Sequence, residues 1–478
     1  MIYKQYINGE FVESNSKEVI EVFNPATNEK LSTIPNGDAV DAQRALDAAK
    51  NAQDSWEEKM PIERAGYLKA MANVIRENRV HLANVLAQEQ AKVFELAQIE
   101  VDFTAEYFDY YAGWARIYEG EIINSDRPGE QILLFKKAMG VVVGICPWNF
   151  PFFVMARKVA PALLTGSTIV IKPSSETPNT TFEFAKLLEK VELPKGVLNI
   201  ISGSGSVLGE ELCRNDITDM ITVTGSVSAG QKIIEASAKN IVKLSLELGG
   251  KAPVIVCNDA DLDLAVSSVV QSRLIFSGQV CNCAERVYVE EGIADEFTKR
   301  VTEAFKNVKV DEPFSKDGIV MSSLVSKAQL DKVTSMVEKA KEEGATVAVG
   351  GNKDSRFDTG FYFEPTLLTE CRQDMQIVQE EVFGPVLPII RVKNVDEAIK
   401  LANDSDFGLT SSVYSQNINT ILKVCKKLKY GETYVNREHF EAMQGFHAGW
   451  RKSGLGGADG KHGLEEFLQT HVVYMQEN

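Results

Sequence analysis

The sequence predicts an α/β fold made of two successive parallel-sheet units, with a small β hairpin and an extended C-terminal tail added to them. Short apolar runs alternate with helical patterns over most of the chain, which is typical of strands joined by crossover helices. The alternation restarts after Gly250, which indicates a second unit. Two extended, polar segments, 118–137 and 465–476, fit neither unit.

The strands of the first unit are expected at 140–145, 168–171, 197–201 and 220–223, and a helix is expected over 180–191. These strands are continuous apolar runs, as expected where both faces of a parallel sheet are covered by helices. Near the N-terminus, Asp38 can cap a helix whose apolar residues recur at helical spacing, at Ala42, Ala45, Leu46 and Ala49. The run 252–256 is expected to be the first strand of the second unit.

The two remaining segments are expected to be extended. Segment 118–137 contains the turn Asp126–Gly129 between extended runs and predicts a hairpin. The run 470–474 predicts a C-terminal strand. An exposed hairpin and a terminal strand need partners, and pairing across subunits is one answer.

The composition limits the classes of function. With 478 residues, 44% hydrophobic and 25% charged, the chain has the composition of a globular protein. Its net charge of −16 argues against a nucleic-acid partner and, more weakly, against an anionic membrane surface. It has neither a signal-peptide pattern nor an apolar run of about 18 residues. Seven cysteines do not form a disulfide framework, so we expect a cytoplasmic protein.

Cys281, in the run Ser277–Cys283, is the first candidate for chemistry. Gly278 would let a ligand approach the backbone, and a helix beginning at Cys281 would lower the pKa of its thiol. The alternative is that Cys281 and Cys283 are small buried hydrophobic residues, which their own surroundings favour. Their spacing is neither a zinc pattern nor a redox pattern, and no metal site is expected.

Glu247 and Asn149 are further candidates. Glu247 lies within an apolar strand, where desolvation would raise its pKa toward the range of a general base. A salt bridge at the end of the strand is the alternative. Asn149 lies between Pro147 and Pro151, where its amide could donate to an oxyanion or simply form a turn.

Two glycine-rich segments, 203–209 and 224–230, each follow an apolar strand and precede a helical run. This position suits phosphate binding at the N-terminus of a helix. Tight turns between strands and helices use the same residues, and neither segment has the Gly-x-Gly-x-x-Gly pattern, so each is weak evidence alone.

Taken together, six motifs resemble the aldehyde dehydrogenase superfamily, in the order expected for it: 147–151, 172–173, 224–226, 246–251, 278–281 and 380–385. The resemblance extends from Asn24 to the C-terminus. It implies two Rossmann-like domains, a cofactor-binding domain (1–117 and 138–246) and a catalytic domain (247–458). It also implies an oligomerisation element (118–137 and 459–478) and a homodimer or homotetramer.

The resemblance also implies the chemistry. The Cys281 thiolate attacks an aldehyde, the Asn149 amide and the Cys281 backbone N–H hold the oxyanion, and Glu247 activates the water that hydrolyses the thioester. The implied cofactor is NAD. The implied cofactor contacts are Trp148, Lys172, Ser175, Gly225, Ser226, Glu381 and Phe383.

Segments 118–123, 281–288 and 441–451 resemble the members of this family that oxidise lactaldehyde and glycolaldehyde. This closer resemblance implies that the substrate is a small hydroxyaldehyde, contacted by Arg157, Asn282, Glu441 and His447. Hydrogen-bonding side chains suit such a substrate, whereas an apolar tunnel would suit fatty aldehydes. A semialdehyde or another small aldehyde is the alternative.

One residue departs from the pattern of NAD-preferring relatives. They have Glu at the third position after the lysine, whereas this chain has Ser175 there and Glu176 one position later. A carboxylate repels the 2′-phosphate of NADP and a serine does not, so we expect NADP to be accepted as well as NAD.

Two other classes of protein remain as alternatives. A cysteine hydrolase would need His447 within hydrogen-bonding reach of Cys281. A non-catalytic scaffold would not need Cys281, Glu247 and Asn149 together.

Overall fold

The computed structural model describes residues 1–316 and 318–477, and its first large sheet has the strand order β19-β11-β10-β7-β8-β9-β1-β2. The five central strands run parallel. They are β11 (Lys243–Glu247), β10 (Met220–Thr224), β7 (Val141–Ile145), β8 (Thr168–Lys172) and β9 (Leu198–Ile200). Antiparallel strands flank them: β1 (Gln5–Ile7), β2 (Glu10–Val12) and β19 (Gly454–Leu455). A separate two-stranded sheet is formed by β3 (Val19–Phe23) and β4 (Lys30–Pro35).

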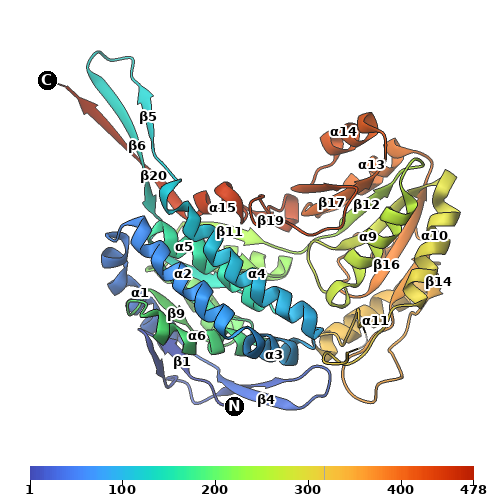
Figure 1. Cartoon of the computed structure of the whole chain (residues 1–478), viewed down its shortest axis with the longest axis horizontal. Coiled ribbons are helices and arrows are strands. Elements are labelled where there is room, and N and C mark those ends of the chain that lie inside the picture. Colours follow the sequence, from blue (N-terminus) through green and yellow to red (C-terminus); the bar gives the residue numbers. More distant parts are fainter. Residues whose placement is uncertain (317, 478) are drawn as a thin grey trace.

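Helices cover this sheet (Figure 1). The helices between its strands are α1 (Ala39–Glu57), α5 (Pro151–Thr165), α6 (Asn179–Val191), α7 (Glu210–Arg214) and α8 (Val227–Ser237). A further layer contains α2 (Pro61–Glu77), α3 (Arg79–Gln90) and α4 (Phe94–Gly113). Every residue of α5 is buried, because α5 packs on the sheet and is covered by α2 and α4. As predicted, Asp38 caps α1 by accepting from the backbone N–H groups of Val40 and Asp41.

The second large sheet has the order β14-β15-β16-β13-β12-β17-β18. Six strands are parallel: β15 (Thr366–Thr369), β16 (Val386–Val392), β13 (Ala284–Glu290), β12 (Ala252–Val256), β17 (Thr410–Tyr414) and β18 (Glu432–Val435). The edge strand β14 (Thr346–Val349) is antiparallel. The helices of this unit are α9 (Leu262–Leu274), α10 (Glu291–Lys306), α11 (Lys327–Glu342), α12 (Gln376–Gln379), α13 (Val395–Asn403) and α14 (Ile418–Lys427).

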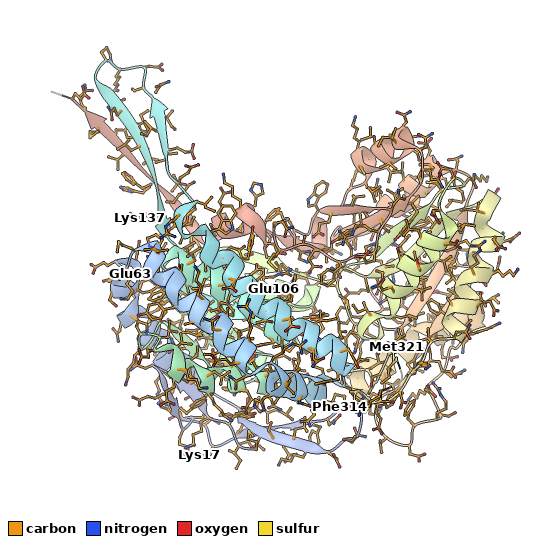
Figure 2. The ribbon with its side chains drawn as sticks, viewed as in Figure 1. Lys17, Glu63, Glu106, Lys137, Phe314 and Met321 are labelled. Atoms are coloured by element: carbon orange, nitrogen blue, oxygen red, sulfur yellow. The ribbon has the colours of Figure 1, made fainter. Side chains whose placement is uncertain are left out.

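The predicted hairpin and tail form one three-stranded antiparallel sheet, which projects from the body as an arm (Figure 1). Its strands are β5 (Glu121–Asn124), β6 (Glu130–Ala138) and β20 (Leu468–Gln476), with β6 in the middle. Figure 2 shows Lys137 at its base. The hairpin and the tail therefore pair with each other within one chain, while Ile122 (79% exposed) and Tyr474 (67%) face solvent.

The prediction of an α/β fold with two parallel-sheet units and a small β element is confirmed. Residues 454–466 also contribute to the first unit, because β19 joins its sheet and α15 (Gly460–Glu466) packs against α5. The assignment of residue ranges to a cofactor-binding domain, a catalytic domain and an oligomerisation element stays a prediction. Among the helices of the described residues, none is long and apolar enough to cross a membrane.

Candidate active site

Cys281 lies in a turn between a short 3-10 helix (Ile275–Gly278) and β13, and it is half-buried. A helix beginning at Cys281, the condition under which a helix dipole would stabilise its thiolate, is not present. The residues after it enter β13, a strand of seven buried residues held between β12 and β16. Sheet pairing thus decides the conformation here, and the dipole of a helix starting at Cys281 is not available to the thiolate.

Gly278 serves the packing of the backbone rather than the approach of a ligand. Its φ is +75°, and a Cβ there would lie 2.2 Å from the carbonyl oxygen of Gly384. Arg273 donates to the Gly278 carbonyl from the other side. The expectation that a small residue here admits a ligand is corrected: a glycine is needed because two backbone segments approach each other.

Asn149 lies in the loop after β7, immediately before α5, and its side chain reaches the segment that carries Cys281. Its amide Nδ2 donates to the carbonyl oxygen of Gln279 at 3.0 Å. The Asn149 carbonyl accepts from Gln90 Nε2 and Lys92 Nζ, both at 2.8 Å. The loop is thus held from both sides, and the amide carries a second N–H that remains for a substrate oxygen.

Lys92 and Glu100 form a fully buried ion pair beneath this loop. Glu100 Oε1 also accepts from the backbone N–H groups of Phe152 and Phe153, in the first turn of α5. The ammonium of Lys92 lies 3.7 Å from the ring centroid of Phe150. No sequence pattern indicated this pair, which fixes the position of Asn149.

Arg157, on α5, is a buried centre of charge that joins three carboxylates. It lies 2.8 Å from Asp459, 3.0 Å from Glu441 and 3.7 Å from Glu247. Asp459 was missed by the sequence analysis because it lies 302 positions from Arg157 along the chain. The guanidinium brings Glu247 and Glu441 to the same side of the site.

The pKa of Glu247 moves opposite to the predicted direction. Burial alone would raise it, but the positive charges of Arg157, Lys158 and His447 and the hydroxyl of Thr224, which donates at 2.9 Å, lower it below its ordinary value. Glu247 is therefore ionised and able to accept a proton from water. The correction has a simple reason: the countercharges come from α5 and from residue 447, which no local pattern around Glu247 reveals.

His447 and Asn282 complete the neighbourhood of Cys281. The buried His447 ring is hydrogen-bonded through Nδ1 to Glu432 Oε1 at 2.5 Å. Asn282, beside the cysteine, donates its amide to Glu441. Arg157, Asn282, Glu441 and His447, the four predicted substrate contacts, thus lie together.

A pocket opens in front of Cys281. Its polar lining includes Asn149, Arg157, Asn282 and Glu441, all predicted from the sequence. Glu100 and Thr224 also line it. The other lining residues were not predicted and are largely apolar: Leu96, Ile99, Phe103, Phe150, Phe153, Val154, Ile275, Val280, His439 and Phe440. Aromatic residues in helices and loops are ordinarily core residues, so their sequence gave no signal of a pocket.

The predicted cofactor residues lie at the ends of the strands of the first sheet and near the junction with the second unit. Lys172 ends β8 and lines a pocket with Gly209, Ser228 and Lys232, and burial lowers its pKa to about 8. Ser226 caps α8 by accepting from the N–H of Ala229 at 3.2 Å.

The other cofactor candidates occupy neighbouring positions. The Gly225 N–H donates to the carbonyl oxygen of Glu247 at 3.0 Å. Ser175 lines a separate pocket, and its hydroxyl donates to the carbonyl oxygen of Gly203 at 3.4 Å. Glu381 accepts from the N–H of Gly250 at 2.7 Å, and burial together with a nearby carboxylate raises its pKa to about 7.

Trp148 and Phe383 pack edge to face, with ring centroids 5.2 Å apart. Trp148 precedes Asn149, and Phe383 lies two positions after Glu381. The two rings therefore bring the Asn149 loop next to the Glu381 loop, the first from one unit and the second from the other. Within the described residues, no group of His, Cys, Asp and Glu is arranged to hold a metal ion.

Residues 11–473 match the model of the aldehyde dehydrogenase family. The chain belongs to the aldehyde dehydrogenase family. It is 56% identical to lactaldehyde dehydrogenase of Escherichia coli (strain K12), over 99% of this chain and 98% of that protein. The crystal structure of the E. coli enzyme covers 100% of this chain and 99% of its own, with a TM-score of 0.98.

Two further structures show relatives with cofactors bound. A 3,6-anhydro-L-galactose dehydrogenase in complex with NADP is 43% identical, covers 100% of both chains and has a TM-score of 0.97. Betaine aldehyde dehydrogenase of Staphylococcus aureus in complex with NAD+ is 38% identical, covers 99% of this chain and 95% of its own, and also has a TM-score of 0.97. The prediction of an NAD(P)-dependent aldehyde dehydrogenase is confirmed at the level of the family.

The buried pair beneath the Asn149 loop gives a test of its structural role. In E100Q, Lys92 would keep its charge without a countercharge in an apolar setting, and we expect the stability to fall by about 3 kcal/mol. Thermal denaturation of the purified protein measures the change. The control is D109N, which breaks the exposed pair of Asp109 with Arg76 and should cost less than about 1 kcal/mol. Equal effects of the two substitutions would contradict the prediction.

Proposed function

We propose that this protein oxidises a small hydroxyaldehyde, such as lactaldehyde or glycolaldehyde, to the carboxylic acid with NAD(P), and that Cys281 is the nucleophile. The observation that carries the proposal is the arrangement around Cys281. The Asn149 amide is hydrogen-bonded to the segment that carries Cys281, and Arg157 holds Glu247 near the same site. Polar side chains line the adjoining pocket. The similarity to lactaldehyde dehydrogenase over nearly the whole chain supports the choice of substrate.

The first step is addition of the Cys281 thiolate to the aldehyde carbonyl. A bond forms between Sγ and the carbonyl carbon, and negative charge moves to the oxygen. That oxygen is held by the second N–H of the Asn149 amide and by the backbone N–H of Cys281. Donors fixed in advance at the point where charge develops stabilise the transition state by several kcal/mol, on the order of 3.

The residues at the ends of the first sheet fit a dinucleotide. Lys172 offers a buried amine, Ser226 lies at the start of α8, and an apolar wall including Ile145 and Ile233 lines the same pocket as Lys172. Glu381 would accept from ribose hydroxyls, and Gly225, Trp148 and Phe383 would pack against the cofactor. A nicotinamide held by these residues would supply the hydride acceptor needed to convert the Cys281 adduct into a thioester.

Glu247 performs the last step by taking a proton from water as the water attacks the thioester carbon. The C–S bond then breaks, the acid leaves and the thiolate is restored. The lowered pKa of Glu247 keeps it ionised at neutral pH, so that it is ready to accept this proton. Arg157 and Thr224 set the direction of its carboxylate.

The pocket favours a small substrate with a hydroxyl group. Asn282, Glu441 and His447 offer donors and acceptors within the immediate surroundings of Cys281. A semialdehyde is the second candidate, because the positive charge of Arg157 could attract the carboxylate of such a substrate. Glu441 and Asp459 already balance the charge of Arg157, however, and this favours the neutral hydroxyaldehyde.

A substrate panel on the purified protein tests this function. We expect lactaldehyde and glycolaldehyde to be oxidised with higher kcat/KM than hexanal and succinic semialdehyde, because their hydroxyl group can add a hydrogen bond to the polar groups beside Cys281 and they bring neither extra length nor a charge. C281A is the matched control and should oxidise none of them. Faster turnover of the longer aldehydes, or activity in C281A, would refute the proposal.

A separate prediction concerns the role of Glu247. In E247Q the first turnover should still release one reduced cofactor per site, because addition and hydride loss do not need the carboxylate. Steady-state turnover should fall about a hundredfold or more as the thioester accumulates. Stopped-flow absorbance of the reduced nicotinamide distinguishes the two phases. The control is E438Q, at a partly exposed glutamate paired with Arg437, which should behave as the unaltered protein. Loss of the initial burst together with the steady state would contradict this role.

For the cofactor, we propose that NAD is used with weak discrimination against NADP. Ser175 places no carboxylate where a 2′-phosphate would lie, and the family includes relatives with either cofactor bound. The preference for NAD in kcat/KM should therefore stay below about a thousandfold.

The substitution S175E tests this proposal. The introduced carboxylate should repel the 2′-phosphate and raise the NAD preference at least about tenfold, a difference of about 1.4 kcal/mol. Steady-state kinetics with both cofactors measure the ratio. E176Q is the control: if it lowers the NAD preference, Glu176 already supplies the discrimination and the proposal for Ser175 is wrong.

We also propose that the chain forms a homo-oligomer, a dimer or tetramer, through the arm. Its edge strands leave backbone groups and apolar side chains such as Ile122 and Tyr474 at the surface, which favours docking on another copy. All seven cysteines are free thiols, which supports a reducing compartment such as the cytoplasm.

A further inference from the structure

We propose that Glu285 is a positioning residue that holds two segments of the site in a fixed relation to each other. One segment carries Cys281, and the other carries Glu381 and Phe383. The proposal rests on the proposed roles of Cys281 as the nucleophile and of Glu381 and Phe383 as cofactor contacts, and it adds the group that couples them. Glu285 takes no part in the steps described above.

The carboxylate of Glu285 accepts four hydrogen bonds inside the protein. Glu285 is the second residue of β13, and its side chain is 1% exposed. Its Oε2 accepts from Lys251 Nζ at 2.7 Å and from the backbone N–H of Val382 at 3.2 Å. Its Oε1 accepts from Arg273 Nη1 at 2.7 Å and from the backbone N–H of Phe383 at 3.2 Å. These four bonds use the full accepting capacity of a carboxylate, so the side chain has one orientation.

The two backbone N–H groups belong to the segment that presents the cofactor candidates. Val382 is buried, whereas Glu381 and Phe383 on either side of it are partly exposed. Glu285 therefore binds the backbone of this segment and leaves the side chains of Glu381 and Phe383 available for a ligand. The directions in which these two side chains point depend on where Glu285 holds their backbone.

Arg273 connects Glu285 to the turn that carries Cys281. Its Nη1 also donates to the carbonyl oxygen of Ala284 at 2.9 Å, and its Nη2 donates to the carbonyl oxygen of Gly278. Gly278 and Ala284 each lie three positions from Cys281, one before it and one after it. The guanidinium of Arg273 thus bridges the turn, and Glu285 fixes the guanidinium.

Lys251 connects Glu285 to the short stretch of chain between the two segments. Gly250, which precedes Lys251, donates its N–H to Glu381 Oε1 at 2.7 Å. A Cβ on Gly250 would lie 2.5 Å from the carbonyl oxygen of Cys281. The backbone of Gly250 therefore packs against both segments, and the ion pair of Lys251 with Glu285 holds it there.

Glu285 stays ionised in this setting. Burial alone would raise its pKa, but the positive charges of Lys251 and Arg273 lower it to about 2. A glutamine at this position would remove the countercharge of both buried cations, and it would offer one accepting oxygen to four donors. The substitution would release the backbone of the cofactor segment without removing a side chain that faces a ligand.

The test is a double-mutant cycle on the dissociation constant of NAD, measured by titration calorimetry without aldehyde. E285Q should raise this constant at least about tenfold, because Glu381 is no longer held in its binding direction. E381Q should weaken binding in the otherwise intact protein and by a smaller factor when E285Q is present, since residues that act as a unit have non-additive effects. Additive effects of the two substitutions would overturn the proposal.

A second measurement concerns the segment that carries Cys281. The reduced nicotinamide formed in a single turnover, at saturating NAD and aldehyde, should appear about tenfold more slowly in E285Q, because a displacement of about 1 Å can cost up to a hundredfold. A residue that served only stability would lower the melting temperature and leave both this rate and the NAD dissociation constant unaltered in the folded protein. That outcome would also overturn the proposal.

The matched control is E290Q, on the same strand. Glu290 is the last residue of β13, is buried, and accepts from the backbone N–H of Asn258 at 2.6 Å. E290Q should lower the melting temperature but leave NAD binding and the single-turnover rate unchanged.

If E285Q does not fold, E285D takes its place, because it keeps the charge but is one methylene too short to reach Val382 and Phe383. Unchanged NAD binding in E285D would then overturn the proposal. Failure of the intact protein to oxidise any aldehyde would instead refute the proposed function, and the binding cycle, which needs no aldehyde, would keep its meaning.

Discussion

The buried guanidinium of Arg157 is the interaction on which the site depends. It extends from α5 of the first unit and binds Asp459 near the C-terminus, Glu441 of the loop after β18, and Glu247 at the end of β11. Removing one member of such a cluster leaves uncompensated buried charge, at a cost of several kcal/mol, roughly 3 to 5. Segments far apart in the chain are therefore fixed around one point, and that point lies beside Cys281.

The site is also a junction between the two units. Asn149 comes from the loop after β7 of the first sheet and donates to Gln279, two positions before the cysteine that precedes β13 of the second. Beneath it, Lys92 and Glu100 hold the loop from the helical layer. Near the same junction, the backbone N–H of Phe94 donates to the carbonyl oxygen of Pro313, and the Phe94 ring packs on Phe314, which is labelled in Figure 2. The geometry around Cys281 thus depends on how the units pack.

The sequence predicted the features that depend on residues close together in the chain. The apolar runs became strands and Asp38 became a cap. Each glycine-rich segment leads from a strand into a helix, the first through the π-helical turn Gly205–Gly209 and the second directly into α8. No helix begins at Cys281, because the chain there leads into the buried strand β13, which pairs with β12 and β16. The predicted direction of the pKa shift of Glu247 was wrong for a similar reason, because the charges that lower this pKa lie elsewhere in the chain.

The residues that were not predicted share one property: each takes its role from a partner that is distant in the sequence. Glu432 is an ordinary first residue of a strand until His447 is placed beside it, and Asp459 gains its role only from Arg157. The motif resemblance named Arg157, Glu441 and His447 because it compares whole chains and so carries information about contacts that no single segment contains; their role toward substrate stays a prediction. The resemblance did not indicate which of these side chains contact one another, because that depends on the three-dimensional structure.

That pairing has a consequence for selectivity. The amide of Asn282 already donates to Glu441, Arg157 is balanced by carboxylates, and Nδ1 of His447 is held by Glu432. An aldehyde without a hydroxyl group leaves these hydrogen bonds intact, so no buried polar group loses its partner when this aldehyde binds. Rejection by a factor of about 10⁴ or more requires a site whose polar groups are left unpaired by the wrong substrate. A site satisfied from within discriminates by smaller factors, which suits an enzyme that prefers small polar aldehydes while accepting others of similar size.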